Sequence, residues 1–477
     1  MNKNKNPYIC KTLLLCAMKI IDEKYIYELI KKHSNPASEQ INEIIIKAKE
    51  AKGISLEDAA ILINTNKQQD LEKLFDTAKE IKNKIYGKRV VLFAPLYISN
   101  YCTNDCLYCG FRINNKEMKR VSLEQFEIEK EVVEILEQGH KRVLMLMGEH
   151  PKKASLDYFI ESIHTVYSAK DSKGNTIRRI NLEIEPLTNE EFQQLKNIPI
   201  GTYTVFQETY HRQTYEQVHL SGKKTNYDWR LEVMHRALSN GLHDVGIGAL
   251  FGLYDYRFEV LGLLSHAMNL DKEFNIGPHT ISIPRLQYAH NAPLSAITKY
   301  AVSDNDFKKI IAVLRLAVPS AGMILSTRER AELRMELLDL GISQISSGSR
   351  TNPGGYKQAF NEIDSSQFTL NDGRTSGEII ENIIELGYIP SFCTSCYQVG
   401  RVGEKFMQIA KKGDIKLFCQ PNALVTLNEY LIDYANENVR EKGKQLIQNE
   451  LNTMLTDKEI TEKLLNRINT GERNICK

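Results

Sequence analysis

Three cysteines lie within eight residues of the chain, in the stretch YISNYCTNDCLYCGFR (97–112). Their spacing, Cys102-x3-Cys106-x2-Cys109, lets one short loop bind three corners of a 4Fe-4S cluster and leaves the fourth iron without a protein ligand. Zinc is the alternative, but structural zinc takes four ligands, and no further cysteine or histidine lies near enough in sequence to complete the set. The spacing therefore predicts an iron–sulfur cluster with one open coordination position.

A second group of three cysteines lies near the other end of the chain, with the spacing Cys393-x2-Cys396-x22-Cys419. A zinc ribbon would need a fourth ligand, and the last histidine of the sequence is His290. Cys476 could supply one, but it lies far from Cys419 and one residue from the end of the sequence. We therefore expect a second 4Fe-4S cluster that also has an open iron.

The composition is that of an ordinary globular protein, with 477 residues, of which 42% are hydrophobic and 26% charged. The net charge of +2 favours neither nucleic acid nor an anionic membrane surface as a partner. No apolar run approaches the roughly 20 residues of a membrane span. Residues 1–17 imitate a signal peptide, but Lys11 interrupts the apolar run and no cleavage site follows. We expect a cytoplasmic protein, with residues 1–17 disordered or preceding a true start at Met18.

Strand and helix patterns alternate through the centre of the sequence. Eight apolar runs are separated by amphipathic helices: 89–98, 142–149, 178–186, 202–209, 244–252, 279–286, 321–329 and 342–349. Eight such units in about 260 residues are typical of an α/β protein with a (β/α)8 barrel of the TIM type. A doubly wound open sheet is the alternative.

The regions that flank these strands read differently. Residues 18–85 show helical periodicity, and residues 376–477 again read as helices without strands. The segment 351–375 is rich in Gly, Ser and Asn, which favours a linker. The predicted order is an N-terminal helical region (18–85), a barrel (86–350), a linker (351–375) and a helical C-terminal domain (376–477) that carries the second cluster.

The first cysteine loop follows the first predicted strand, at the barrel end where active sites lie. With the aromatic Tyr108 before its third cysteine, the loop resembles the cluster-binding motif of the radical S-adenosylmethionine (SAM) superfamily. This resemblance implies that the open iron chelates SAM. It also implies that an electron from the cluster cleaves the sulfonium C–S bond, which gives a 5′-deoxyadenosyl radical.

The two cysteine sets together resemble the HydG family of radical SAM tyrosine lyases, which mature FeFe-hydrogenase. The matching stretches span about residues 80–440 and include FAPLYISNYC, FQETYHRQTYEQVH, DVGIGALFGLYDY, GPHTISIPRLQ, GMILSTRE and SFCTSCYQVGR. The 2-iminoacetate synthases of the thiamine pathway share the barrel motifs but lack the C-terminal cysteines. The family therefore implies cleavage of the Cα–Cβ bond of L-tyrosine to p-cresol and dehydroglycine. Carbon monoxide and cyanide then form at the second cluster, on an extra iron held with free cysteine.

The resemblance also implies partners and leaves two alternatives. A one-electron donor of the flavodoxin or ferredoxin class and other hydrogenase maturation proteins would serve such an enzyme. One alternative is a lyase of the 2-iminoacetate synthase type, which releases dehydroglycine for thiazole synthesis. The other is an iron–sulfur scaffold without catalysis.

Candidate SAM-binding residues follow three strands. Gly148 and Glu149 stand where the superfamily has a Gly-Gly-Glu contact to the methionine amino group, with Met147 in place of the first glycine. Gly246 and Gly248 allow close approach of the backbone to adenine, although tight packing is an equal alternative. Glu183 and Glu185, on one face of a predicted strand, could bind the ribose hydroxyls or form a salt link inside the barrel.

Candidate substrate residues end the fourth and seventh strands. Arg328 could bind the tyrosine carboxylate through its guanidinium fork, with a salt bridge to Glu149 or Glu208 as the alternative. Gln207 and Glu208 could orient the amino group or the phenol.

The extra iron needs a nitrogen ligand. The family pattern GPHT favours His279, at the barrel end opposite the first cluster, with His266 as the second candidate. His290 lies past the other end of the same strand, and the sequence suggests no role for Arg350.

Overall fold

The computed structural model describes residues 19–295, 298–357, 365–454 and 456–477, so the prediction for residues 1–17 lies outside the described residues. Eight parallel strands close into a barrel, because β1 pairs with both β2 and β8. This confirms the predicted (β/α)8 class and excludes the open sheet. The barrel strands are β1 (Arg89–Ser99), β2 (Arg142–Met147), β3 (Arg179–Glu183), β4 (Tyr203–Thr204), β5 (Val245–Gly248), β6 (Thr280–Ser282), β7 (Gly322–Leu325) and β8 (Gln344–Ser346).

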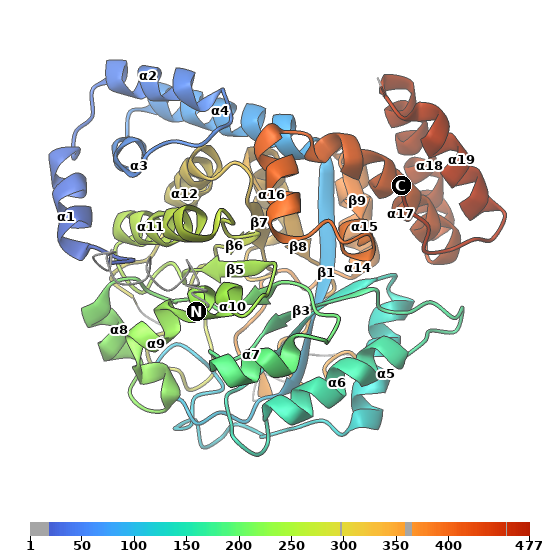
Figure 1. Cartoon of the computed structure of the whole chain (residues 1–477), viewed down its shortest axis with the longest axis horizontal. Helices are drawn as coiled ribbons and strands as arrows, with labels where there is room; N and C mark the ends of the chain where they lie inside the picture. Colours follow the sequence, from blue (N-terminus) through green and yellow to red (C-terminus); the bar gives the residue numbers. More distant parts are fainter. Residues whose placement is uncertain (1–18, 296–297, 358–364, 455) are drawn as a thin grey trace, which may run out of the picture.

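Helices surround the barrel, and further helices precede it in the sequence (Figure 1). Those between the strands are α5 (Gln125–Glu137), α6 (Leu156–Ser168), α7 (Asn189–Leu195), α8 (Arg212–Val218), the 3-10 turn η1 (Lys223–Thr225), α9 (Tyr227–Leu231), α10 (Val233–Ser239), α11 (Tyr256–Phe274), α12 (Asp304–Ala317) and α13 (Ala331–Leu340). Before the barrel lie α1 (Glu23–Lys32), α2 (Ser38–Ala48), α3 (Leu56–Ile63) and α4 (Gln68–Tyr86). The last of these, α4, packs on α12 and α13 and leads directly into β1.

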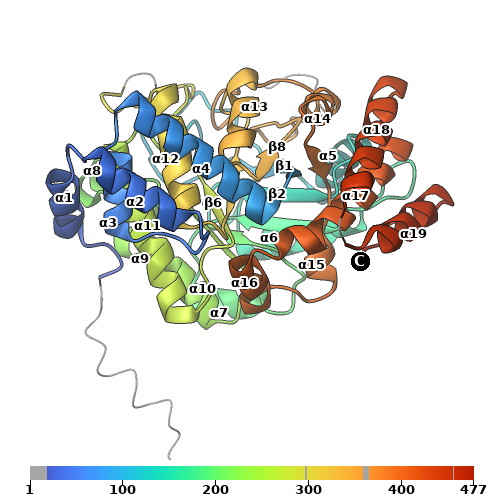
Figure 2. The same cartoon turned by 90° about the horizontal axis from the view of Figure 1, so that it is seen from above.

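The C-terminal region packs on the side of the barrel away from α1–α3 (Figure 2). It contains α14 (Ser376–Glu385), β9 (Ile389–Ser391), α15 (Ser395–Gln398), α16 (Gly403–Lys412), α17 (Ile415–Asp433), α18 (Glu437–Thr453) and α19 (Lys458–Asn469). The expectation that this region lacks strands was wrong, because β9 pairs in parallel with Arg89–Val91 of β1. Three residues, one of them a proline, are too few to show a strand pattern.

The long strand β1 carries these attachments. Residues 89–91 pair with β9, residues 91–93 pair with β8, and residues 94–99 pair with β2. At about 3.3 Å per residue, its eleven residues span over 30 Å, from one end of the barrel to the other. The C-terminal region is therefore joined to the strand that also leads into the first cysteine loop.

The segment expected to be a linker contributes to the barrel mouth. Gln367 accepts a hydrogen bond from the Tyr97 hydroxyl (2.7 Å), and its carbonyl accepts one from the Gly110 amide (2.9 Å). Thr351 donates to the carbonyl of Phe368 (2.9 Å). The described part of residues 351–375 is thus fastened to the first cysteine loop and its strand.

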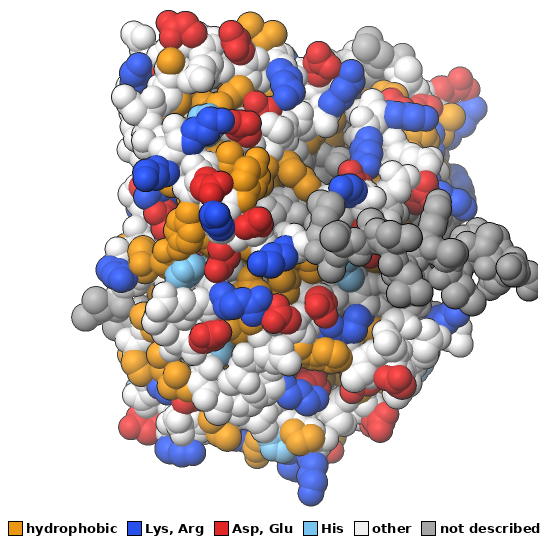
Figure 3. All heavy atoms as spheres, turned by 60° about the vertical axis from the view of Figure 1, so that its left-hand side comes forward, with side chains coloured by type: hydrophobic (Ala, Val, Ile, Leu, Met, Phe, Trp, Pro, Cys, Tyr) orange, Lys and Arg blue, Asp and Glu red, His pale blue; other side chains and the backbone are white. Residues whose placement is uncertain are grey.

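The surface mixes charges of both signs. On the face that Figure 3 shows, which includes α1, α8 and α9, basic and acidic side chains are interspersed. None of the described helices is long and apolar enough to cross a membrane.

A buried lysine in α4 is an unusual element of the fold. Lys82 is 0% exposed, lies 4.2 Å from the ring centroid of Tyr388, and its Nζ has no hydrogen-bond partner among the described residues. Burial lowers the pKa of Lys82 from 10.5 to about 7, and the charge of Arg315 acts in the same direction. The unfolded chain therefore binds the proton more tightly, and this lysine costs stability at neutral pH.

Replacing Lys82 by Met is expected to stabilise the protein. Because the folded pKa lies below the unfolded one, the penalty shrinks as pH rises from about 7 towards 10.5 and is largest below this window. At about 1.4 kcal/mol per pKa unit, Lys82→Met should raise the free energy of unfolding of the apo-protein by about 2–4 kcal/mol near pH 6.5. Urea unfolding across this pH range measures the effect. The matched control Lys79→Met, on the same helix and half exposed, should change stability by less than about 1 kcal/mol.

Candidate active site and iron–sulfur centres

The first cysteine loop begins where β1 ends, at the C-terminal end of the barrel strands. Cys106 is buried, Cys102 and Cys109 are half-buried, and all three thiols are free. Burial and the charge of Glu149 raise the pKa of Cys102 to about 11, and burial also raises the pKa values of the other two. Thiolates at these positions therefore need a bound cation.

The donor set fits a polynuclear cluster better than a single ion. In the residues that the structure describes, no three His, Cys, Asp or Glu side chains converge as ligands of one metal ion. A 4Fe-4S cube binds each thiolate through a different iron, so its three ligands lie apart. The loop carries three free thiols and offers no fourth, which suits a cube with one open corner.

Backbone contacts fix the course of this loop. Thr103 donates two hydrogen bonds to the carbonyl of Glu149, at 2.8 Å from its amide and 3.0 Å from its hydroxyl. The guanidinium of Arg120 donates to the carbonyls of Asn100 (2.7 Å) and Phe111 (2.8 Å). The loop is thereby tied to the end of β2 and to itself, which restricts where its thiols can lie.

Gly148 permits this close approach. A Cβ atom at Gly148 would lie 2.2 Å from the carbonyl oxygen of Tyr101 and 3.2 Å from Cβ of Cys102. Its amide donates to the carbonyl of Ser99 (2.9 Å). The structure thus places Gly148 against the cysteine loop, and backbone packing alone demands glycine here.

The interior of the barrel beside this loop contains a cavity, which we call the mouth cavity. It is lined by Phe93, Pro95, Tyr97, Leu144, Leu146, Glu183, Phe206, Ser282, Pro284, Ile324, Ser326, Thr327, Arg328, Ser346, Ser349, Thr351, Gln367 and Phe368. Most of these residues belong to the C-terminal halves of the strands or to the segments that follow them, where barrel active sites lie.

Arg328 is the cation of the mouth cavity. Its guanidinium lies 3.3 Å from the ring centroid of Phe368, and within the described ranges no carboxylate lies at ion-pair distance from it. The alternative of a salt bridge to Glu149 or Glu208 is wrong, because other cations pair with both carboxylates. A guanidinium that faces a cavity without an anion is available to a carboxylate ligand.

Glu183 lies in the same cavity, at the end of β3. Burial raises the pKa of Glu183 to about 7. The negative charge of Glu208 also raises it, whereas the positive charge of Arg328 lowers it. Glu185 lies beyond the strand and pairs with Lys223 (3.0 Å). The structure therefore places the two glutamates in different surroundings, and of the two it is Glu183 that lines the mouth cavity.

A buried charge network holds Glu149 and Glu208. Arg230 Nη1 lies 3.5 Å from Glu149, Arg230 Nη2 lies 3.7 Å from Glu208, and Lys224 Nζ lies 2.6 Å from Glu208. Burial opposes ionisation, but Lys224 and Arg230 outweigh it and lower the pKa of Glu208. Sequence reasoning missed both cations because they lie on η1 and α9, outside any strand end.

Gln207 and Glu208 extend β4 irregularly. The amide of Gln207 donates to the carbonyl of Gly248 (3.0 Å), and Glu208 has a φ of +72°. The side-chain amide of Gln207 donates to the carbonyl of Tyr227 (3.4 Å), while its Oε1 is buried without a described partner. Gln207 does not line the mouth cavity, so the structure does not bring it together with Arg328.

Packing inside the barrel explains the two glycines of β5, Gly246 and Gly248. A Cβ at Gly246 would lie 2.6 Å from Oγ1 of both Thr204 and Thr280, and one at Gly248 would lie 2.8 Å from the ring of Phe206. The tight-packing alternative therefore accounts for both glycines without a ligand.

The second cysteine set gathers at the opposite end of the barrel. Cys393 follows β9, Cys396 lies in α15, and Cys419 lies in α17. We call the space between them the C-terminal cavity, and it is lined by Tyr86, Arg89, Val91, Arg142, His279, Gly322, Gln344, Cys393, Thr394, Ser395, Cys396, Tyr397, Phe406 and Cys419. The barrel residues in this set begin their strands, so the two cysteine sets lie at opposite ends of β1.

Buried cationic side chains make the C-terminal cavity suitable for an anionic cluster. Nε of Arg89, Nε of Arg142 and Nδ1 of His279 are all buried without a hydrogen-bond partner in the described ranges. A hydrogen bond from the Cys396 thiol lowers the pKa of Cys419. The charge of Arg89 also lowers it, whereas burial raises it. Three thiols beside uncompensated arginines suit a thiolate-bound iron–sulfur cluster, whose charge is negative.

His279 is the imidazole of the C-terminal cavity. Its Nε2 lies 3.2 Å from the Tyr397 hydroxyl, and its Nδ1 lies 3.6 Å from Asp244. Burial lowers the pKa of His279 to about 4 despite Asp244, so the ring is neutral at physiological pH. A neutral imidazole is the form that binds a metal ion.

The other candidates lie elsewhere. His266 is in α11, where its Nδ1 lies 3.1 Å from the Tyr210 hydroxyl, so it does not reach the C-terminal cavity. His290 pairs with Glu117 (3.1 Å) on the surface. Arg350 donates to the carbonyl of Ser349 (3.0 Å), and nothing in the structure explains why an arginine is needed there.

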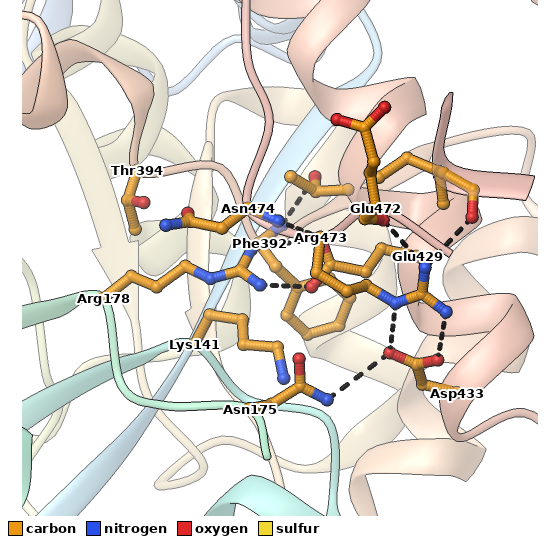
Figure 4. A network of polar contacts seen from close by, with 12 residues as sticks. Lys141, Asn175, Arg178, Phe392, Thr394, Glu429, Asp433, Glu472, Arg473 and Asn474 are labelled. Carbon is orange, nitrogen blue, oxygen red and sulfur yellow. Dashed lines mark hydrogen bonds and ion pairs between the residues drawn. The ribbon is translucent and has the colours of Figure 1, made fainter. Parts of the chain in front are cut away.

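The end of the chain fastens the second cysteine loop (Figure 4). Arg473 pairs with Asp433 of α17 (2.7 Å), and the amide of Asn474 donates to Glu429, which in turn pairs with Arg178 of the barrel. The Cys476 thiol donates to Oε1 of Gln398 (3.5 Å) outside the lining of the C-terminal cavity. The tail therefore supports the cysteine loop, and Cys476 does not complete its ligand set.

Comparisons with known proteins agree with this arrangement. The Radical SAM superfamily matches residues 96–264, and the Biotin and Thiamin Synthesis associated domain matches residues 282–389. With the closed barrel and the cysteine loop at its mouth, these matches define the chain as a radical SAM enzyme.

Similar solved structures narrow the family. A crystal structure of HydG, a maturase of the FeFe-hydrogenase, is 45% identical, with a TM-score of 0.93 over 96% of this chain and 100% of that one. HydG from Carboxydothermus hydrogenoformans is 41% identical, with a TM-score of 0.82 over 94% and 97%. The 2-iminoacetate synthase of Salmonella typhimurium is 31% identical over 345 residues, 72% of this chain and 88% of that protein. The chain belongs to the HydG family.

Replacing Gly148 by Ala is expected to displace the first cysteine loop, because the added Cβ meets the backbone of Tyr101. In anaerobically reconstituted protein, Gly148→Ala should lose about half of the iron and sulfide, since we expect each cysteine set to bind one cluster. Gly373→Ala is the matched control, because a Cβ there meets nothing within 4 Å. Full iron content in Gly148→Ala would contradict this account of the loop.

Proposed function

We propose that this protein is a two-site tyrosine lyase. It cleaves the Cα–Cβ bond of L-tyrosine to p-cresol and dehydroglycine at the mouth cavity, and it converts dehydroglycine to carbon monoxide and cyanide at the C-terminal cavity. These products serve assembly of the FeFe-hydrogenase H-cluster. The observation that carries the proposal is the pair of free cysteine trios at opposite ends of one barrel, with an unpaired arginine in the cavity beside the first.

At the mouth cavity, this chain would bind and orient the substrate. Arg328 binds the tyrosine carboxylate, whereas Gln207, whose side-chain amide donates to Tyr227 of α9, does not line this cavity. Glu208 forms an ion pair with Lys224 and places a negative charge at the end of β4. A 4Fe-4S cluster with SAM, when bound beside this cavity, would supply the radical chemistry that breaks the Cα–Cβ bond.

Cys102, Cys106 and Cys109 would hold the first cluster, and the ends of three strands would hold SAM beside it. Glu149 lies close to the loop through its carbonyl and could accept the methionine ammonium at its carboxylate. Glu183 is the nearest acceptor for ribose hydroxyls within the cavity, whereas Glu185, Gly246 and Gly248 have structural explanations of their own.

At the C-terminal cavity, Cys393, Cys396 and Cys419 would hold the second cluster. The neutral His279 would bind the extra iron, together with a free cysteine molecule. The surrounding barrel wall excludes water, which would otherwise hydrolyse dehydroglycine. A one-electron donor of the flavodoxin or ferredoxin class and other hydrogenase maturation proteins complete the proposed set of partners.

Separating the two stages tests the proposal. Cys393→Ser should keep p-cresol formation and lose carbon monoxide, measured by trapping on deoxyhaemoglobin, because only the second cluster is removed. The wild-type enzyme should form both products. Wild-type p-cresol without carbon monoxide would indicate a lyase of the 2-iminoacetate synthase type. Absence of deoxyadenosine from reduced protein with SAM and tyrosine would indicate a scaffold.

Changing Arg328 to Gln is expected to weaken tyrosine binding. Loss of a charged hydrogen-bond pair worth about 1.5–3 kcal/mol should raise KM for tyrosine by roughly ten- to a hundredfold. Deoxyadenosine formation in the absence of tyrosine should not change, since Arg328 does not hold the cluster. Arg350→Gln, outside the mouth cavity, is the matched control, and an unchanged KM in Arg328→Gln would contradict the assignment.

A further inference from the structure

A large groove opens on the surface beside the C-terminal cavity. It has a volume of about 980 Å³ and lies between the end of α4, α13, the start of β9 and helices α17 and α18. Its wall combines apolar and charged side chains, among them Leu386 and Leu417, which are 52% and 44% exposed, and the pair of Lys88 with Glu450 (3.0 Å). The groove is open to solvent at the barrel end that carries the second cysteine set.

Two residues form the boundary between this surface groove and the C-terminal cavity. Tyr86 and Arg89 line both spaces. On α17, Lys416, Leu417 and Gln420 face the groove, whereas Cys419 faces the cavity. On this side, one helix and two side chains therefore separate the buried Cys393 and Cys419 from solvent, whereas Cys396 is itself partly exposed.

The two boundary residues are held differently. The Tyr86 hydroxyl donates to the carbonyl of Ser320 (2.7 Å), and its ring lies 5.0 Å from the guanidinium of Arg315. The guanidinium of Arg89 lies 5.8 Å from the same ring, and no described residue forms a hydrogen bond or ion pair with it. Arg89 can therefore change rotamer without breaking a hydrogen bond or ion pair to a described residue, whereas the Tyr86 hydroxyl is held by Ser320.

The chemistry of the second site requires such an opening. Under the proposed function, on which this inference rests, the second cluster must take up iron and a small thiol compound and must release its product. The other end of the barrel is the site of SAM and tyrosine, over 30 Å away along β1. Small ligands that pass through the barrel would have to cross an occupied active site.

We propose that the surface groove is the entrance to the C-terminal cavity, with Arg89 as its gate and small anions as the ligands that it admits. The Arg89 guanidinium, which has no partner among the described residues, attracts anions at the boundary. Its rotation then opens the path into the C-terminal cavity. Lys416 on the rim adds positive charge along the same path, because the carboxylates of the groove each pair with another cation: Glu332 with Arg330, Glu336 with Lys308, Asp339 with Lys79 and Glu450 with Lys88. Small carboxylates and thiolates therefore enter in preference to neutral molecules of equal size.

Alkylation of the apo-protein tests the entrance without relying on activity. Iodoacetate modification of Cys419 and Cys396 is followed by mass spectrometry over time. Leu417→Trp should fill the groove and slow the modification of Cys419 several-fold. The matched control is Val399→Trp, because Val399 is similarly exposed (51%) but lies beyond Cys396, on the loop after α15. It should leave the rate unchanged.

The opposite pattern would overturn the proposal: a wild-type rate in Leu417→Trp with slow modification in Val399→Trp would place the entrance at the Cys396 loop. Leu386→Trp, on the other wall of the groove, gives a second test if Leu417→Trp does not fold.

Arg89→Gln should reduce the rate ratio of iodoacetate to iodoacetamide several-fold, and an unchanged ratio would refute the role of Arg89. Tyrosine cleavage, measured as p-cresol, should be normal in both tryptophan variants. Absence of p-cresol from the wild type would instead refute the proposed function and leave the alkylation test intact.

Discussion

The pairing of β1 with three different strands is the constraint on which the rest of the structure depends. Its C-terminal half pairs with β2 and leads into the first cysteine loop, whereas its first residues pair with β9 and place Arg89 beside the second cysteine set. The separation of the two sites is thus set by the length of one strand, and a shift of register along β1 would move both sites at once.

The two sites use charge in different ways. At the mouth cavity, cations from η1 and α9 neutralise Glu149 and Glu208, and only Arg328 remains without an anion. At the C-terminal cavity, Arg89 and Arg142 have unpartnered nitrogen atoms beside three thiols. The first arrangement suits a small ligand that carries a carboxylate. The second suits a large anionic group that stays in place.

Much of this arrangement could be predicted from the sequence, because strand periodicity and cysteine spacing are local patterns. All eight barrel strands and both cysteine trios were identified in this way. Contacts between distant segments could not be read: β9 is too short to show a period, and the partners of Glu208 lie on a separate turn and helix. Gly246 and Gly248 illustrate the same limit, since only the neighbouring Thr204, Thr280 and Phe206 explain why these positions exclude a side chain.

The cationic wall around the second cysteine set has a consequence for how such enzymes diversify. The three thiols come from the C-terminal segment, but Arg89, Arg142 and His279 come from the barrel. The appended segment is therefore not a transplantable module. A single-cluster relative that acquired these helices by fusion would still lack half of the binding environment until substitutions accumulated at the floor of its own barrel.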